Sequence, residues 1–333
     1  MKATAAANAN IAIIKYWGMR DDRLVIPAND SISFTMDDRL QTVTTVEFRD
    51  SLKKDVLMLD GRHATEKERL RVSGFLGIIR KMARTKRFAH VVSMNSFPKS
   101  AGLASSASGF AALAAASAKA AGLELGKKGL SALARRGSGS AARSVHGGAV
   151  EWRAGRKKDG SDCYAVQLSP PERWRALRNV IAITSSREKK TGSMEGMKRT
   201  VVTSELYRCR LESLPPRLAL VRDAIRRGVF RTMAPAIMQE SDSMHAAMLD
   251  SWPPLLYLNG TSLRIMERVL ELNDSHGEPI AAYTFDAGPN AHVYTTARHE
   301  SEVRKALAGI GGIERTITCG VGDGVRYPKK HLF

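Results

Sequence analysis

A run of small residues and hydroxyls between residues 97 and 110 constrains the fold of this chain most strongly. It follows an apolar strand candidate at 88–94 and leads into an alanine-rich segment at 109–121 that carries no charge before Lys119. This order predicts a strand, a loop and a helix, with Ser105 and Ser106 near the helix N-terminus. Unpaired backbone N–H groups at such an N-terminus bind phosphate, and small side chains let phosphate oxygens reach them. The loop is therefore a candidate nucleotide site.

The loop matches neither of the two common nucleotide motifs. The chain contains no Gly-x-x-x-x-Gly-Lys-Ser/Thr, and no Gly-x-Gly-x-x-Gly follows the first strand. Loops rich in Ala, Gly and Ser also allow a helix to pack closely on a sheet. Taken by itself, the segment supports phosphate binding and a purely structural role equally.

Length and composition predict a large folded core. The chain has 333 residues and 43% hydrophobic content, enough for one large domain or two ordinary ones. Nothing at the N-terminus resembles a signal peptide, and no run of about 18 apolar residues occurs, so we expect a cytoplasmic protein without a membrane span. The spacing of Cys163, Cys209 and Cys319 fits neither a disulfide framework nor a metal site. We assign no metal ligand to a protein side chain.

The net charge of +19 favours an anionic partner. The basic residues lie in short, scattered clusters such as Lys53-Lys54 and Arg156-Lys157-Lys158. No aromatic residues alternate with them, and no helix-turn-helix or zinc-finger spacing is present. We therefore interpret most clusters as solvated faces and expect a small, multiply phosphorylated substrate, with no specific nucleic-acid partner.

The order of predicted elements indicates an α+β fold. Strand candidates lie at 9–15, 31–36, 40–48, 150–152, 164–168, 179–184, 281–285 and 291–296. Helical patterns lie at 70–83, 109–121, 127–136, 200–214, 216–228, 229–250 and 260–274. Because helices dominate after residue 190, we place a domain boundary there, with one domain at 1–188 and a second at 189–333.

Four motifs together resemble those of one family. They are Asn-Ile-Ala-Ile-Ile-Lys-Tyr-Trp-Gly at 10–18, the loop at 97–110, Gly-Ser-Gly-Ser-Ala-Ala-Arg-Ser at 137–144, and Thr-Phe-Asp-Ala-Gly-Pro-Asn-Ala at 284–291. In this order they resemble the mevalonate diphosphate decarboxylase family of the GHMP kinase superfamily, over nearly the whole chain. The resemblance implies a GHMP kinase-like fold. Its N-terminal portion, like domain 2 of ribosomal protein S5, would carry the ATP phosphate loop, and a C-terminal α/β sandwich portion would contribute a catalytic aspartate.

The same resemblance implies an activity in the mevalonate pathway of isoprenoid biosynthesis. With ATP and Mg²⁺, such enzymes phosphorylate the 3-hydroxyl of mevalonate 5-diphosphate, and loss of that phosphate with CO₂ gives isopentenyl diphosphate. A tertiary alcohol leaves poorly until it is phosphorylated, and positive charge at C3 then lets the carboxylate collapse to CO₂ and an alkene. Homodimers are the usual assembly of such enzymes, so we expect one here.

The resemblance assigns catalysis to Asp286, Arg143 and Lys15. Asp286 would orient the 3-hydroxyl, accept its proton and favour cationic character at C3. Arg143 would hold the substrate carboxylate through a bidentate pair, and Lys15 would reach the reacting hydroxyl or phosphate. The structural alternatives are an Asx-turn for Asp286, a helix-surface position for Arg143 and a strand-end lysine for Lys15.

Substrate binding falls on four further residues by the same resemblance. Ser138 and Ser140 would hydrogen-bond the 5-phosphate groups, with Tyr16 assisting through its hydroxyl. The two serines also suit N-cap and turn positions. Ser193 lies where the family contacts substrate or nucleotide, although a surface turn explains it almost as well.

The ATP phosphates and Mg²⁺ are expected at the loop before the alanine-rich helix. Ser105 and Ser106 would hold them, and Gly102 and Ala104 would give access to the backbone. The histidines carry less information, and we interpret His146 and His292 as packing and strand residues.

One position departs from the family pattern. The usual motif continues Lys-Tyr-Trp-Gly-Lys-Arg, and its second lysine touches the diphosphate, whereas this chain has Met19 there. A thioether carries no charge and donates no hydrogen bond, so Arg20 or another basic residue has to compensate. Otherwise a phosphomevalonate decarboxylase acting on the 5-monophosphate, or an ATP-independent bisphosphomevalonate decarboxylase, becomes attractive.

Two rival functions remain from the sequence. A small-molecule kinase of the same superfamily would stop at phosphorylation, but Arg143 beside Ser138 and Ser140 favours decarboxylation. A nucleic-acid-binding protein would use the basic surface and bind with a steep salt dependence. The motifs make both less attractive than the decarboxylase.

Overall fold

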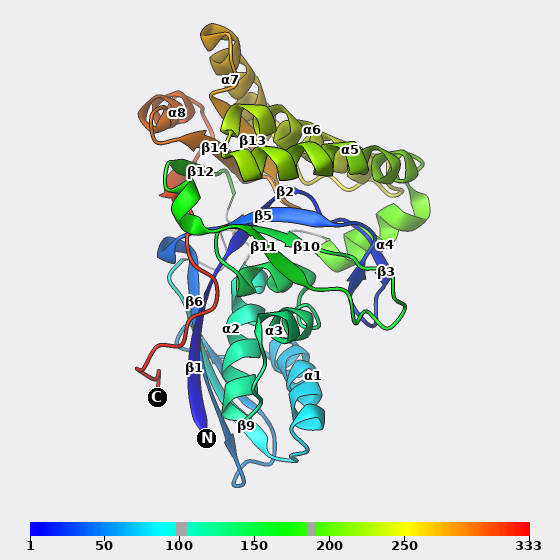
Figure 1. Ribbon diagram of the computed structural model, residues 1–333, viewed down its shortest axis with the longest axis vertical. Helices are drawn as coiled ribbons and strands as arrows, with labels where there is room; N and C mark the ends of the chain where they lie inside the picture. The colour runs from blue at the N-terminus through cyan, green and yellow to red at the C-terminus, as the bar shows by residue number, and fades with distance from the viewer. Residues whose placement is uncertain (98–104, 186–190) are drawn as a thin grey trace.

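The computed structural model describes residues 1–97, 105–185 and 191–333 and has an α+β fold built around three sheets (Figure 1). Gly102 and Ala104, predicted to contact ATP, lie outside the described residues. The elements fall into three groups along the long axis of the molecule, with the N-terminal elements at one end and α5 to α8 at the other.

The first group is a five-stranded sheet covered by three helices. The strand order is β1 (Lys2–Asn8), β6 (Gln41–Arg49), β9 (Phe88–Asn95), β7 (Val56–Leu59) and β8 (Arg62–His63). The helices are α1 (Glu66–Met82), α2 (Ser105–Ala120) and α3 (Lys127–Ala134). Most residues of α2 are buried, because its alanines let the helix lie close to the strands. The predicted strand and helix are confirmed as β9 and α2, and α2 begins at Ser105, four residues before the expected 109. Residues 98–104 between them lie outside the described residues.

The second group is a four-stranded sheet in the middle of the molecule. Its order is β11 (Ala165–Ser169), β10 (Ala149–Trp152), β5 (Ser31–Thr35) and β2 (Asn10–Ile14). Short elements surround it: the ribbon β3 (Met19–Asp21) and β4 (Ile26–Pro27), and the 3₁₀ helices η1 (Asp38–Leu40), η3 (Gly139–Val145) and η4 (Pro171–Trp174). Most of the motif at 137–144, which contains Arg143, forms η3. This short helix packs between α2, α3 and the middle sheet.

The third group is the sheet β13 (Ala281–Phe285), β14 (Ala291–Thr296), β12 (Leu177–Ile183) and β15 (Arg315–Cys319), in that order. Its helices are α4 (Ser193–Thr203), α5 (Leu206–Arg227), α6 (Phe230–Leu249), α7 (Gly260–His276) and α8 (Glu300–Ala308). Apolar residues of β2 and β5 belong to the same core cluster as this sheet and helices α5 to α8. The middle sheet thus shares one core with the C-terminal elements, which brings β2 toward β13.

The helix boundaries predicted after residue 190 are partly wrong. One helix was expected at 200–214 and another at 216–228, but α4 ends at Thr203 and α5 continues through Pro215 and Pro216. Both prolines lie on the exposed face of α5, where water can bind the carbonyls that they leave unpaired. Packing of α5 against α6 outweighs the lost hydrogen bonds.

Sequence patterns did not predict β1, α8 or β15. β1 consists mainly of Ala and Thr and shows no alternation of apolar and polar residues, because both of its faces are covered. Cys163, Cys209 and Cys319 are free thiols, and Cys209 is exposed while the other two are buried.

The C-terminal tail returns to the N-terminal sheet. Bridges join Ala6 to Arg326 and Met36 to Val321, and the Thr4 hydroxyl hydrogen-bonds His331 Nδ1 at 2.7 Å. β12 pairs with β14 and β15 although it precedes residue 189. The expected boundary between 188 and 189 stays a prediction.

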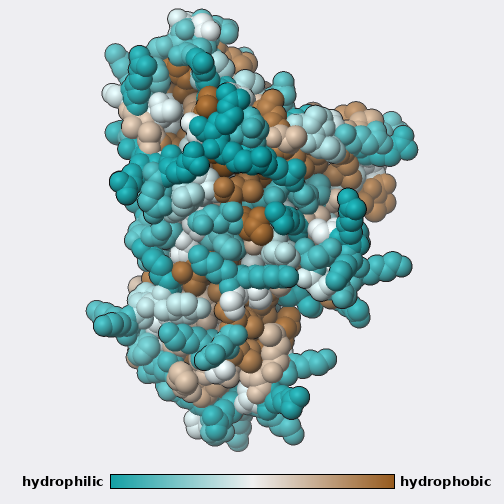
Figure 2. All heavy atoms as spheres, in the orientation of Figure 1, coloured by the Kyte–Doolittle hydropathy of each residue, from teal (hydrophilic) through white to brown (hydrophobic). Residues whose placement is uncertain are grey.

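Hydrophilic residues cover most of the face shown in Figure 2, and apolar residues appear between them in separate small areas. In the described part of the chain, no helix combines the length and apolar character needed to cross a membrane.

Candidate active site

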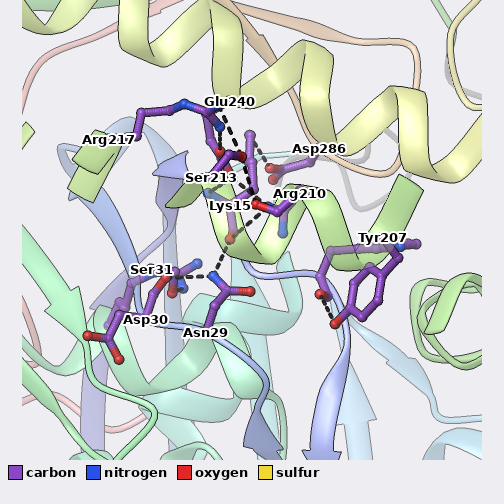
Figure 3. Close-up of polar contacts among 12 residues, drawn as sticks. Lys15, Asn29, Asp30, Ser31, Tyr207, Arg210, Ser213, Arg217, Glu240 and Asp286 are labelled. Atoms are coloured by element: carbon purple, nitrogen blue, oxygen red, sulfur yellow. Dashed lines mark hydrogen bonds and ion pairs between the residues drawn. The ribbon is translucent and has the colours of Figure 1, made fainter. Parts of the chain in front are cut away.

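Lys15 and Asp286 form an ion pair at the meeting point of two strand ends. Lys15 follows β2 and Asp286 follows β13, and the Lys15 Nζ to Asp286 Oδ1 distance is 2.8 Å (Figure 3). The lysine side chain is 1% exposed, whereas the aspartate side chain is 39% exposed. The pair therefore has a buried cation on one side and a carboxylate open to a ligand on the other.

Electrostatics keep Asp286 ionised. Burial opposes its negative charge, but the Lys15 ammonium and the other nearby positive charges outweigh that effect and lower the pKa of Asp286 to about 2. Burial also lowers the pKa of Lys15 from its ordinary value, and the neighbouring carboxylate offsets part of this shift. The charge on Lys15 thus depends on Asp286.

Two buried histidines flank the ion pair. Burial lowers the pKa of His245 on α6 and of His292 on β14 to about 4, so both are neutral near pH 7. The His245 ring meets Phe285 edge-on, and His292 Nδ1 lies 3.2 Å from the Asn179 amide. The expectation that His292 is a strand residue is confirmed, and His146 is likewise buried.

Arg143 on η3 is a buried cation near Asp286. Its Nε donates to Asn10 Oδ1 at 2.9 Å and its Nη1 donates to Ser31 Oγ at 2.6 Å. Burial lowers the pKa of Arg143 to about 10, and Asp286 opposes that shift, so the guanidinium stays protonated near neutral pH. A helix-surface role is therefore wrong for Arg143, because the side chain is 3% exposed and held by two strands.

The backbone of Lys15 is held from three directions. Asn29 Nδ2 and Arg210 Nη2 donate to its carbonyl at 2.9 and 3.3 Å, and its N–H donates to Glu240 Oε1 at 3.2 Å (Figure 3). Glu240 is fully buried and pairs with Arg210 at 2.5 Å and with Arg217 at 2.6 Å. Helices α5 and α6 thus fix the position of a lysine that belongs to β2.

Sequence analysis missed Glu240 and Arg210. A signal for the glutamate was present, because Glu240 shares the helical spacing of Ile237 and Met244 and so occupies the apolar face of α6. A charged residue on such a face requires a buried partner. The sequence does not reveal that the partner comes from α5.

The structure brings the predicted phosphate-binding hydroxyls together. Ser138 Oγ lies 3.4 Å from both Ser106 Oγ and Ser140 Oγ, which joins the N-terminus of α2 to η3. Among the residues that the structure describes, the buried Tyr16 hydroxyl has no hydrogen-bond partner, and a Cβ added to Gly139 would lie 3.0 Å from it. An unpaired buried donor beside two serines is suited to an anionic oxygen.

A cavity of about 210 Å³ opens beside the N-terminus of α2. The sheet strands β6, β7 and β9 and the helices α1 and α2 line it, and Ser105 and Ser106 contribute to its wall. Leu57, Val91 and Phe110 give it an apolar surface, and Arg71 adds a cation. The cavity can accept a flat apolar group linked to phosphates at the helix end.

Three further residues singled out from the sequence, Ser193, Met19 and Arg20, have contacts of their own. Ser193 is the first residue of α4, and the Thr191 carbonyl before it accepts a hydrogen bond from the Tyr257 hydroxyl at 3.1 Å. Met19 packs against the apolar cluster around Trp17. Arg20 Nη2 donates to the carbonyl of Ala154 at 3.2 Å, so its guanidinium binds a neighbouring loop.

Taken together, cations outnumber carboxylates in the buried group around Lys15, which favours an anionic ligand. Arg143 suits a carboxylate, the serines suit phosphate oxygens, and Asp286 can accept a hydrogen bond from an alcohol. The arrangement can hold an acidic alcohol that carries a phosphate.

Comparisons with known proteins cover both halves of the chain. The family model of the diphosphomevalonate decarboxylase-like N-terminal domain matches residues 7–165. The model of the mevalonate 5-diphosphate decarboxylase C-terminal domain matches residues 179–323. Human diphosphomevalonate decarboxylase is 44% identical over 308 residues, which cover 88% of this chain and 76% of the human protein.

Solved structures agree over almost the whole length. Mevalonate diphosphate decarboxylase from Staphylococcus aureus superposes with a TM-score of 0.93 at 36% identity and covers 98% of both chains. A structure of MDDEF in complex with MVAPP, AMPPCP and magnesium superposes with a TM-score of 0.91 at 36% identity and covers 99% of both chains.

Proposed function

The chain belongs to the diphosphomevalonate decarboxylase family, and we propose that it catalyses the ATP-dependent decarboxylation of mevalonate 5-diphosphate to isopentenyl diphosphate through 3-phosphorylation. Its fold is the GHMP kinase-like fold of its structural relatives. One observation carries the assignment of the site: the ionised Asp286 pairs with buried Lys15 next to Arg143. A kinase that stops at phosphorylation does not release CO₂. It therefore does not need a buried arginine such as Arg143 to orient the substrate carboxylate.

Asp286 is the proposed partner of the substrate 3-hydroxyl. A carboxylate with a pKa of about 2 is a weak base, so it removes little of the hydroxyl proton before the new O–P bond forms. Phosphoryl transfer through a loose transition state relies mainly on alignment and charge, which suits such a group. After transfer, the same negative charge favours the positive charge that builds at C3 as phosphate leaves.

Lys15 and Arg143 are proposed to bind the two negatively charged groups of the substrate near C3, the incoming phosphoryl group and the carboxylate. Lys15 holds Asp286 in place at 2.8 Å and offers its ammonium to the incoming phosphoryl group. Arg143, fixed by Asn10 and Ser31, binds the substrate carboxylate and sets its orientation for loss of CO₂. Because three groups hold the Lys15 backbone, the lysine is positioned before substrate arrives.

Tyr16, Ser138 and Ser140 are the proposed anchors of the 5-diphosphate. The buried hydroxyl of Tyr16 has no partner in the described structure and lies beside Gly139, between the two serines. Ser193, at the start of α4, is proposed to reach the substrate from the C-terminal elements.

ATP and Mg²⁺ fit the N-terminus of α2. Ser105 and Ser106 are proposed to hold the phosphates, together with the backbone at Gly102 and Ala104, and the apolar cavity would accept the adenine. ATP supplies the phosphoryl group, and Mg²⁺ neutralises its charge. The 3.4 Å contact between Ser106 and Ser138 supports this placement, because it brings the helix end to the substrate motif.

The test is product analysis with purified protein. We expect mevalonate 5-diphosphate with ATP and Mg²⁺ to yield ADP, phosphate and CO₂ in equal amounts. ADP without CO₂ would identify a kinase, and CO₂ release without nucleotide from a 3,5-bisphosphate alone would identify the ATP-independent reaction. Omission of Mg²⁺ serves as the control.

The 5-monophosphate is a second candidate substrate because of Met19. Met19 packs in an apolar cluster, and Arg20 is bound to the Ala154 carbonyl, so neither extends a charge to a second phosphate. Comparing kcat/KM for the mono- and diphosphate decides between the two substrates. Installing the family residue with Met19→Lys should raise kcat/KM for the diphosphate only.

The protein is further proposed to act as a cytoplasmic homodimer with domains at 1–188 and 189–333. Mass measurement in solution by light scattering tests the dimer, and limited proteolysis tests the boundary.

A further inference from the structure

Two histidines and a glutamate converge where α7 ends and α8 begins. His276 is the last residue of α7, His299 is the N-cap residue of α8, and Glu302 lies in its first turn. His276 Nε2 is 2.9 Å from Glu302 Oε1, and His299 Nδ1 is 3.6 Å from Glu302 Oε2. One ligand atom from each of the three residues lies within 4.8 Å of the others. None of the three takes part in the proposed active site.

Packing of the two helices holds these side chains near one another. Val303 and Leu307 on the inner face of α8 belong to the same buried cluster as Ile265 and Val269 of α7. Figure 1 shows α7 and α8 at the end of the molecule opposite α1 to α3. The backbone positions of the three residues are thus set by the core, while their side chains stay partly exposed and can be reached by a solute.

We propose that His276, His299 and Glu302 form a binding site for a divalent transition metal ion such as Zn²⁺. Two imidazole nitrogens and one carboxylate oxygen are a ligand set that Zn²⁺ binds readily, with water in the remaining position. Bonds of 2.0–2.2 Å in a tetrahedral site place ligand atoms about 3.4 Å apart. The two imidazole-to-carboxylate contacts, 2.9 and 3.6 Å, bracket this value. All three ligand atoms lie within 4.8 Å of one another, so side-chain rotations have to bring the two imidazole nitrogens and one carboxylate oxygen to a common ion. Mg²⁺ prefers oxygen ligands in octahedral geometry and is excluded by the imidazoles.

The surrounding charges are mixed. The C-terminal end of α7 carries partial negative charge and favours a cation, whereas the N-terminal end of α8 opposes it. Glu300, the other acidic residue in the first turn of α8, is paired with Arg178 at 3.0 Å. Coordination bonds therefore provide the affinity, and a bound ion fastens the end of α7 to the start of α8.

The experiment is a calorimetric titration of the full chain with ZnCl₂, without nucleotide or substrate. The variants are His276→Gln, His299→Asn and Glu302→Gln, which keep the size of each side chain, and Asn remains a good N-cap. We expect one site of measurable affinity in the unsubstituted chain and an affinity lower by about tenfold or more in each variant, because each loses one of three ligands. At the same Zn²⁺ concentration, the Tm of the unsubstituted chain should also rise more than the Tm of each variant.

Matched controls separate this site from other zinc ligands. His63→Ala and Cys209→Ser remove an exposed imidazole and an exposed thiol elsewhere, and both should bind Zn²⁺ as the unsubstituted chain does. Excess Mg²⁺ should not displace the zinc. Equal zinc affinity in the three variants and the unsubstituted chain, or no heat of binding with Zn²⁺ in large excess, overturns the proposal.

Discussion

Asp286 combines a partly exposed carboxylate with a pKa of about 2, and both properties depend on Lys15. A fully exposed aspartate would have no neighbouring cation to lower its pKa. A fully buried aspartate without a cation would have a raised pKa and would be neutral. The ion pair keeps a negative charge at a place that substrate can reach. This is what a reaction that develops positive charge on carbon requires.

Asp286→Asn should lower kcat by about 10²–10⁴-fold, because the amide neither accepts the hydroxyl proton nor stabilises charge at C3. Circular dichroism should show an unchanged fold. Asp274→Asn, at an exposed aspartate near the end of α7, is the matched control and should retain full activity. Activity of Asp286→Asn equal to that of the control removes the catalytic assignment.

Lys15→Met should raise the pKa of Asp286 from about 2, because the ammonium that opposes the effect of burial is lost while Arg143 remains. In the unsubstituted chain, the lowered pKa of Asp286 keeps its carboxylate fully ionised above pH 4. The carboxylate gains a proton only as the pH falls through about 2. Carboxyl-carbon NMR, with the Asp286 signal assigned through Asp286→Asn, measures the change. A pKa that stays near 2 in Lys15→Met contradicts the proposed role of the lysine.

Helices α5 and α6 act on the site through the group Arg210, Glu240 and Arg217. They contribute no atom to the proposed substrate contacts, yet they set the backbone of Lys15. The pairing joins helices of the C-terminal half to a strand near the N-terminus, so the packing of α5 on α6 and the position of Lys15 are coupled.

Glu240→Gln should destabilise the protein by about 3–5 kcal/mol, because it leaves buried Arg210 without its counter-charge. Denaturant unfolding measures this loss. Glu212→Gln on α5 removes an exposed carboxylate that pairs with Arg208, and it should cost no more than about 1 kcal/mol. In the folded fraction of Glu240→Gln, kcat should fall more than KM rises, because Lys15 is displaced while the phosphate anchors remain. Equal stability of Glu240→Gln and Glu212→Gln would contradict the stabilising role of the ion pairs that Glu240 forms with Arg210 and Arg217.

The C-terminal tail connects the ends of the molecule. It returns from β15 past the end of η3 to β1, and its backbone hydrogen-bonds Val145 of η3 and Ala6 of the N-terminal sheet. The molecule therefore does not separate simply into an N-terminal and a C-terminal piece, and the fold depends on contacts between residues more than 280 positions apart.

Gly324→Ala should lower the free energy of unfolding by about 1–3 kcal/mol, because the added Cβ would meet backbone atoms that cannot rotate away. The Val145 carbonyl oxygen lies 2.4 Å and the His146 carbonyl carbon 2.5 Å from that Cβ position. Gly311→Ala is the control, since nothing lies within 4 Å of its added Cβ, and its stability should change by no more than about 0.5 kcal/mol. Thermal and denaturant unfolding compare the pair, and equal stabilities would count against a close approach of the tail to η3.

The local pattern of the chain determined the elements that carry the chemistry. The apolar run at 88–94 and the alanine-rich segment at 109–121 placed Ser105 and Ser106 near the N-terminus of a helix, although α2 begins at Ser105 itself. The strands around Asp286 were placed to within one residue. Motif resemblance then identified the family. These features depend on short-range periodicity and on residue types at fixed spacing, which any single sequence displays directly.

Only the tertiary structure decided which of these residues meet and what charge they carry. The ion pair of Lys15 and Asp286 closes across 271 positions. The helical spacing of Glu240 indicated only that it needs a buried partner, and nothing local indicated that this partner is Arg210 or that the tail at Gly324 packs against η3. The physical reason is that burial and Coulomb interactions depend on distance in space. A lysine at a strand end is solvated or buried according to the helices that pack over it, and its sequence neighbours do not contain that information.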